Sequence, residues 1–242
     1  MRARWLAAAS FHRYYFHKGE IVAIATRYTS PADLPDQIPL FPLSGALLLP
    51  RTDLPLNIFE PRYLLMIEQA MKADRIIGII QPAENGDMVA PRLESIGCAG
   101  RITSYSETDD GRLLVTITGI CRFSILSEVN VATPYRQARV DYRSFAVDFV
   151  NETGARSVNR EQLITAFRQY LEANNMSADW KEVEAVSTEV LVNTLSLLAP
   201  YPARDKQALL EAPDLKSRAD VLVALTELAL AKSAPGSSRR MQ

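Results

Sequence analysis

Short apolar runs punctuated by proline and glycine fill the chain from about residue 38 to about residue 146. The runs LLLP, LPLNIF and RIIGIIQP have the length and composition of strands rather than of helices. The clearest piece follows Asp110-Gly111, a typical hairpin turn pair, where residues 113–118 alternate between apolar and polar side chains. This part of the chain is therefore predicted to form β hairpins.

Gly119 interrupts that alternation and predicts a bulge or a bend in the second strand of the hairpin. Beyond it, Cys121, Phe123 and Ile125 resume the period of two. Cys121 is therefore interpreted as a packing residue. Another alternating segment, YRQARVDYR, closes the β region.

The stretch PLNIFEPRYLLMI marks a change from strand to helix. Pro61 suits the first turn of a helix, where its missing N–H costs nothing, and Glu60 is placed to accept the unpaired amides there. Residues 64–71 then carry apolar side chains at helical spacing. We expect Arg62 to pair with a carboxylate and Tyr63 to support the start of the helix, in preference to a reactive site at this position.

The second half of the chain changes to a helical pattern. Residues 147–159 are polar and predict a connection, and Asn159 with Gln162 then resembles a capping box. An apolar stripe at helical spacing follows it. The residues of this stripe are Leu163, Phe167, Tyr170 and Leu171.

Prolines divide the rest of the helical half. A second, strongly apolar helix must stop at Pro200 and Pro202. Pro213 then separates a short helix from a longer terminal one, for which Asp214 is the predicted N-cap.

These patterns divide the chain into four segments. Residues 1–37 have no sustained period and are interrupted by prolines, so they are predicted to be a linker-like extension. Residues 38–146 form the β domain, residues 147–232 the helical domain, and residues 233–242 a tail of disordered composition. The predicted fold class is α+β.

Composition excludes several classes of protein. The 242 residues include 27 Lys and Arg against 28 Asp and Glu, so no overall field attracts polyanions or a membrane surface. No apolar run reaches the roughly 20 residues that span a bilayer. The Arg-rich start is expected to be an unstructured extension rather than a transit segment. Cys98 and Cys121 are too few for a disulfide framework, which favours a cytoplasmic location.

Motifs for catalysis are not found in the sequence. Neither a phosphate-binding P-loop, nor a dinucleotide fingerprint, nor a G-x-S-x-G nucleophile turn occurs, and no particular Ser-Lys pair is indicated. His12 and His17 lie in the N-terminal tail without a pattern of metal ligands. Asp109 and Asp110 are explained by a turn. No catalytic residue, cofactor or metal site is therefore predicted.

One alternative comes from the strands, which carry several arginines with interleaved tyrosines. Such residues on one sheet face could stack bases and contact phosphates of RNA. The near-zero net charge favours an ordinary solvated outer face instead. The residues are Arg101, Arg112, Arg122, Arg136, Arg139, Arg143, Tyr105, Tyr135 and Tyr142.

The order of these pieces resembles the N-terminal substrate-binding domain of Lon proteases, especially the stand-alone bacterial form. The resemblance rests on IPLFPLSGALLLPRTDLPLNIFEPRYLLMIEQAM, RIIGIIQP and IGCAGRITSYSETDDGRLLVTITGICRFSIL, followed by the helical segment, and it runs from about residue 38 to residue 232. It implies a PUA-like β pseudo-barrel followed by a helical bundle. In Lon this region helps to recognise unfolded or tagged proteins, whereas separate modules hydrolyse ATP and cut peptides.

The resemblance implies a binding protein rather than an enzyme, because those separate modules have no room in this chain. We expect it to bind unfolded polypeptide or a protein partner in protein quality control, with a protease or an ATPase as a candidate partner. The alternative is an RNA-binding PUA-like module. Apolar side chains in a concave surface between the two domains would form the site, with Leu56, Ile58, Phe59, Tyr63 and the first apolar helix as candidates. No membrane partner is expected.

Overall fold

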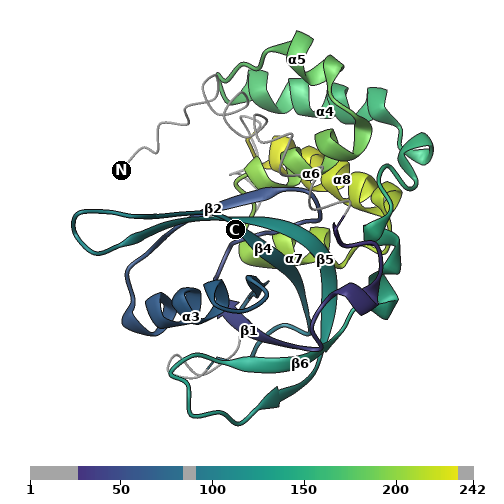
Figure 1. The fold of residues 1–242 in the computed structure, drawn as a ribbon. Coiled ribbons are helices and arrows are strands. Elements are labelled where there is room, and N and C mark those ends of the chain that lie inside the picture. Colours follow the sequence, from purple (N-terminus) through teal and green to yellow (C-terminus); the bar gives the residue numbers. More distant parts are fainter. Residues whose placement is uncertain (1–26, 84–90, 234–242) are drawn as a thin grey trace, which may run out of the picture.

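The protein is described by a computed structural model that covers residues 27–83 and 91–233 (Figure 1). The strands are β1 (Gln37–Pro42), β2 (Asp53–Ile58), β3 (Ile76–Ile80), β4 (Ile96–Glu107), β5 (Leu113–Val129) and β6 (Gln137–Asp141). The helices are α3 (Pro61–Met71), α4 (Arg160–Ala173), α5 (Trp180–Ala185), α6 (Thr188–Leu198), α7 (Ala203–Glu211) and α8 (Leu215–Ser233). Three short 3-10 helices are η1 (Pro31–Asp33), η2 (Arg143–Phe149) and η3 (Ala155–Ser157).

The six strands form one sheet in the order β2-β5-β4-β3-β1-β6, and an additional pairing joins β5 to β6. That pairing closes five of the strands into a barrel and leaves β2 as a flanking edge strand. The long strand β5 makes this possible, because its first part pairs with β2 and β4 and its last part with β6. The predicted α+β class is confirmed.

The predicted hairpin is the contact between β4 and β5. Gly111 lies in the turn with a φ of 76°, and Leu113, Val115 and Ile117 are buried as the alternation predicted. The register shifts between Ala99 and Gly100, opposite Gly119. The predicted bulge is therefore confirmed.

The predicted change from strand to helix is also confirmed, since β2 ends at Ile58 and α3 begins at Pro61. One detail was wrong: the side chain of Glu60 does not cap the helix. It accepts a hydrogen bond from Arg62 Nε at 2.9 Å, because this neighbouring cation competes with the backbone amides for the carboxylate. The pairing predicted for Arg62 is thus present.

Most helix signals in the second half are confirmed, although only one of the two bonds of the predicted capping box is present at the start of α4. Asn159 Oδ1 accepts from the backbone N–H of Gln162 at 3.1 Å at the start of α4, and Asp214 Oδ1 accepts from that of Ser217 at 2.7 Å at the start of α8. Helix α6 ends before Pro200. Two members of the predicted stripe on α4 are buried, Leu163 and Phe167, and the other two are partly exposed, Tyr170 and Leu171.

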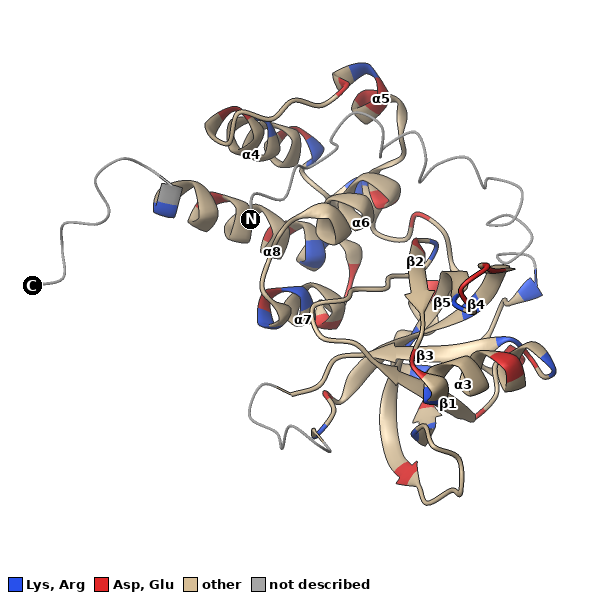
Figure 2. Ribbon diagram, turned by 90° about the vertical axis from the view of Figure 1, so that its left-hand side faces the viewer, with Lys and Arg blue, Asp and Glu red and all other residues tan. Residues whose placement is uncertain are grey.

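One of the two apolar clusters of the described residues joins the sheet to the helices. It contains residues of β2, α3 and β5 together with residues of α4, α6 and α8. Helices α4 to α8 lie together on one side of the strands, whereas α3 lies on another (Figures 1 and 2). The sheet and the helices therefore pack together through this cluster, whereas the second cluster lies among the strands, η2 and the segment before β1.

Two segments predicted to be connections are folded instead. Tyr28 and Leu34 are buried, so the chain packs about ten residues before the predicted start of folded structure near Ile38, and Arg101 Nη1 donates to Tyr28 Oη at 2.9 Å. In the predicted connection 147–159, Asp148 is buried. The prolines and polar residues that suggested linkers are compatible with 3-10 turns. The predictions for His12 and His17 lie outside the described residues.

Both cysteines are free and buried, as expected for packing residues. Burial raises the pKa of the Cys98 and Cys121 thiols above their usual range, which leaves little thiolate at neutral pH. We expect iodoacetamide at pH 8 to modify the native protein more than about 100-fold more slowly than the urea-unfolded protein. Mass spectrometry of timed samples measures both rates. Rapid modification of the native protein would show that these thiols are accessible.

Candidate functional site

The four residues suggested by the sequence do not form one open site. Ile58 and Tyr63 are 3% and 6% exposed and belong to the core, where the Tyr63 ring lies 4.2 Å from that of Phe41 between centroids. Leu56 packs partly against the same core. Phe59 alone is open, with 62% of its surface exposed. Leu56, Ile58 and Tyr63 are therefore apolar because they belong to the core that β2 and α3 share.

The edge of β2 that faces away from β5 is the next feature of this region. Within the described part of the protein, β5 is the one strand that pairs with β2. Pro55, in the middle of β2, has no N–H, and proline is tolerated in a strand where that N–H would point away from the neighbour, so the outer edge of β2 lacks one donor there and its carbonyls remain as acceptors. The unpaired backbone groups of such an edge can accept an added strand.

A hollow of about 320 Å³ lies between the start of β2 and helix α6. Helix α6 contributes six lining residues, of which Glu189 and Asn193 are polar and buried. The other four lie at positions i, i+4, i+7 and i+8, so they share one face of the helix. They are Val190, Thr194, Leu197 and Leu198. Residues 51–53 form the opposite wall and residues 151–152 lie at one end. We call this hollow the β2–α6 groove; α6 lies next to β2 in both views (Figures 1 and 2).

Charged residues fix one wall of the β2–α6 groove. Arg51, which has a φ of 62°, donates from Nε to Glu189 Oε1 at 3.0 Å and from Nη1 to the carbonyl of Asp148. The other carboxylate oxygen of Glu189 accepts from the backbone N–H of Glu152 at 2.7 Å. These contacts join β2, η2 and α6, so they hold Arg51 in its unusual backbone conformation.

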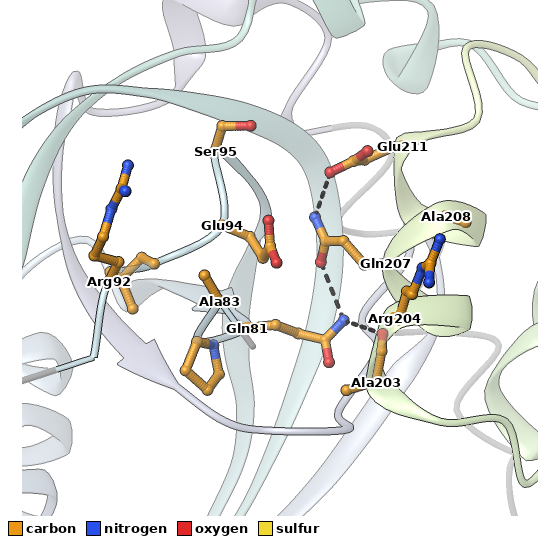
Figure 3. Close-up of a pocket in the computed structure, with 12 residues that line it drawn as sticks. Gln81, Ala83, Arg92, Glu94, Ser95, Ala203, Arg204, Gln207, Ala208 and Glu211 are labelled. Carbon is orange, nitrogen blue, oxygen red and sulfur yellow. Dashed lines mark hydrogen bonds between the residues drawn. The ribbon is translucent and has the colours of Figure 1, made fainter. Parts of the chain in front are cut away.

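A second hollow, of about 660 Å³, lies between residues 81–83, residues 92–95 and helix α7 (Figure 3). Two buried glutamines form its floor. Gln81 Nε2 donates to the carbonyl of Ala203 and to Gln207 Oε1, each at 3.0 Å. Gln207 Nε2 donates to the carbonyl of Ile96 at 3.1 Å and to Glu211 Oε1 at 2.8 Å. We call this hollow the α7 pocket.

A buried ion pair ties the end of α7 to the sheet. Arg122, on β5, is 1% exposed and donates from Nε and Nη2 to the two carboxylate oxygens of Asp148, at 2.9 and 2.8 Å. Its Nη1 donates to the carbonyls of Leu210, at 3.1 Å, and Ala212. The guanidinium also lies over the Phe145 ring, 4.7 Å from its centroid. This network therefore fixes the C-terminal end of α7 against β5 and η2.

The arginine and tyrosine face proposed for RNA is not assembled in the structure. Arg122, Tyr135 and Tyr142 are buried, so they lie neither on an RNA-binding face nor on a solvated one. Arg136 and Arg143 are engaged with Glu128 and Asp141. The alternation along the strands failed to show this, because loops and helices cover both faces of the barrel in places.

The described residues do not contain the features of a metal site or of a membrane-spanning helix. In 27–83 and 91–233, no three His, Cys, Asp or Glu side chains come together as a metal site would require. No helix of that part of the chain is both long enough and apolar enough to cross a membrane.

The family described as ATP-dependent protease La (LON) substrate-binding domain matches residues 37–227. Lon protease 2 of Myxococcus xanthus is 28% identical over 204 residues, which cover 80% of this chain and 24% of that protein. The Lon protease of Heliobacterium modesticaldum is 28% identical over 191 residues, covering 77% of this chain and 23% of that protein. The chain thus spans about a quarter of the length of these relatives.

Two solved structures share the fold. The Lon N-terminal domain protein from Xanthomonas campestris has a TM-score of 0.57 and 21% identity, covering 78% of this chain and 97% of that chain. The N-terminal domain of the Mycobacterium avium complex Lon protease has a TM-score of 0.58 and 19% identity, covering 79% of this chain and 98% of that chain. These similarities support the described arrangement of sheet and helices.

Proposed function

Because the chain belongs to the LON substrate-binding domain family, we propose that it binds exposed apolar segments of unfolded polypeptides and has no catalytic role of its own. The observation that carries this proposal is the β2–α6 groove, which places the start of β2 beside four residues of one α6 face, three of them apolar. Unfolded chains offer both free backbone groups and apolar side chains, whereas folded proteins bury them.

In this proposal an extended segment adds to the outer edge of β2 and places alternate side chains against α6. Backbone hydrogen bonds would supply affinity that does not depend on sequence, and the apolar helix face would select apolar side chains. Burying one leucine-sized side chain contributes about 1.5 to 3 kcal/mol. After the cost of ordering the bound segment, two or three such contacts correspond to micromolar rather than nanomolar affinity.

We also propose that residues 38–146 and residues 147–232 act as the two walls of this site, and that a protease or an ATPase receives the bound polypeptide. Full-length Lon proteases are the curated relatives, and the chain matches about a quarter of each. Co-purification of the protein with its partner ATPase or protease, followed by a degradation assay with an unfolded substrate, tests this delivery role.

Fluorescence anisotropy tests the proposed binding directly. The protein is titrated into a labelled unfolded polypeptide, its folded counterpart and a structured RNA, each at low and at high salt. We expect saturable binding of the unfolded chain alone, which persists at high salt because apolar burial is not screened. Binding of RNA that weakens steeply with salt would instead support the nucleic-acid alternative.

Substitution in the groove gives a sharper test. Leu198→Asp is expected to weaken binding of the unfolded polypeptide about tenfold or more, because a carboxylate replaces apolar surface at the α6 wall. Leu228→Asp is the matched control, since Leu228 is also an apolar helix residue, 50% exposed, but lies outside the groove lining. Equal affinities for the two variants would show that the polypeptide binds elsewhere.

A further inference from the structure

We infer that the α7 pocket binds carboxylate groups of the polypeptide that the protein recognises, so that acidic residues or a free chain terminus are read together with apolar ones. This inference rests on the proposed function and specifies the substrate further. It concerns a different hollow from the β2–α6 groove, with no lining residue in common.

The two glutamines at the floor of the α7 pocket have no free N–H group for a ligand, so charged side chains on the walls would have to bind it. Both N–H groups of the Gln81 amide and both of the Gln207 amide are already donated to protein acceptors. A ligand that entered would therefore meet no free donor from these amides. The polar groups that remain are those on the walls.

Two arginines line the pocket on opposite sides. Arg92 comes from the segment that leads into β4, and Arg204 comes from the first turn of α7 (Figure 3). Within the described part of the chain, neither side chain makes an ion pair or a hydrogen bond, and both are exposed. A guanidinium without a partner can bind a carboxylate through two parallel N–H groups, which a lysine cannot do.

Glu94 lies between the two arginines and narrows the class of ligand (Figure 3). Its carboxylate makes no hydrogen bond to a described residue, and Glu211 adds a second negative charge on the α7 wall. These charges disfavour a bare polyanion such as a phosphodiester chain. A peptide satisfies both kinds of group, because its N–H groups can donate to Glu94 while its carboxylates accept from the arginines.

The pocket is large and rigid enough for such a segment. Its volume of about 660 Å³ lies within the range of about 300 to 1,000 Å³ that ligand pockets occupy. Helix α7 is held at its start by the bond from Gln81 to the carbonyl of Ala203, and at its end by the bonds from Arg122 to the carbonyls of Leu210 and Ala212. The backbone that carries Arg204 is therefore fixed, and the side chain of Arg204 is the part that becomes ordered on binding.

Three labelled peptides of one length, with the same apolar residues, test this inference by anisotropy at low salt. One carries two Glu and an amidated end, the second two Gln and an amidated end, and the third two Gln and a free carboxyl end. We expect the Glu peptide, the free-end peptide or both to bind about threefold to fivefold more tightly than the amidated Gln peptide. The peptide that binds more tightly than the amidated Gln peptide shows whether the carboxylate comes from a Glu side chain or from the chain terminus.

Variants assign the preference to the pocket. Arg92→Glu and Arg204→Glu are each expected to abolish the preference for carboxylate-bearing peptides. A further peptide that carries two Lys in place of the two Gln should bind Arg204→Glu more tightly than it binds the wild type. Arg139→Glu is the control, because it changes the net charge by the same amount at an exposed arginine on β6 that lies outside the pocket lining. It should keep the preference.

The outcomes separate this inference from the proposed function. Equal binding of all three peptides to the wild type overturns the carboxylate pocket and leaves apolar recognition intact. A preference that survives both pocket variants, or that Arg139→Glu also removes, overturns the pocket as its source. Failure of every peptide to bind overturns the proposed function and this inference with it.

Discussion

Arg122→Met is expected to lower the free energy of unfolding by about 3 to 5 kcal/mol. Arg122 and Asp148 are both buried, and the substitution leaves the carboxylate of Asp148 without its cation. The carbonyls of Leu210 and Ala212 lose their donor as well. Each buried polar group left without a partner costs about 1 to 3 kcal/mol, and methionine restores none of these bonds. Urea denaturation followed by circular dichroism measures the change.

Arg143→Met is the matched control for this experiment. Arg143 also makes a two-bond contact with an aspartate, Asp141, through Nε and Nη2 at 2.9 and 3.0 Å, but its side chain is 81% exposed. Water and salt screen that pair, so little or no change is expected. If Arg122→Met unfolds in the same urea concentration as Arg143→Met, the buried network does not stabilise the protein.

The Arg122 network also has an expected effect on function. It fixes the end of α7, which forms one wall of the α7 pocket, and Asp148 additionally bonds to Arg51 at the β2–α6 groove through its carbonyl. Because one aspartate serves both hollows, we infer that loosening it changes both. Peptide affinity of Arg122→Met should therefore fall even under conditions in which the variant remains folded.

Local signals in the sequence were sufficient for much of the fold. The Asp110-Gly111 turn, the Asn159 cap and the Asp214 cap each depend on groups within three residues, so their outcome can be read without knowing the rest of the structure. The bulge at Gly119 was predicted in the same way. The order of these pieces then identified the family, which no single motif could do.

Contacts between distant residues were out of reach of such signals. Arg122 has the spacing of an outward-facing residue on an alternating strand, and its acceptors lie 26, 88 and 90 residues further along the chain. The β2–α6 groove likewise depends on the contact of Arg51 with Glu189, 138 residues apart. Burial of these groups is decided by which elements pack together, and this requires the three-dimensional structure.

The candidate binding residues illustrate a further limit of sequence reasoning. Leu56, Ile58, Phe59 and Tyr63 were chosen because they are apolar, but burial in the core and exposure for binding favour the same side chains. A signal that separates them is an apolar residue on a helix face that the core does not use. Val190 and Leu198 fit this description in α6, and spacing alone did not show which face the core uses.

Gly119→Ala is expected to destabilise the protein by about 3 kcal/mol or more. The reason is that the backbone at Gly119 crosses in close contact with the backbone at Leu49. A methyl group on Gly119 would lie 2.1 Å from the carbonyl oxygen of Leu49 and 2.8 Å from its carbonyl carbon, which are backbone atoms that a rotamer change cannot move. The backbone there is also fixed, because the N–H of Arg51 donates to the carbonyl of Gly119 at 2.8 Å, and the N–H of Gly119 to that of Thr52 at 2.9 Å.

The destabilisation expected for Gly119→Ala comes from a steric clash, and Gly111→Ala is the control that measures the effect of backbone conformation alone. Gly111 has a φ of 76° but nothing within 4 Å of an added methyl group, so its substitution should cost about 1 kcal/mol from the left-handed conformation alone. Urea denaturation of both variants gives the comparison.

Because the crossing at Gly119 positions Arg51 and the start of β2, the Gly119 variant should also lose affinity for unfolded polypeptide, whereas Gly111→Ala should keep it. Equal stability of the two variants would mean that residues 49–52 can move away from β5, and that the wall of the β2–α6 groove is not rigid.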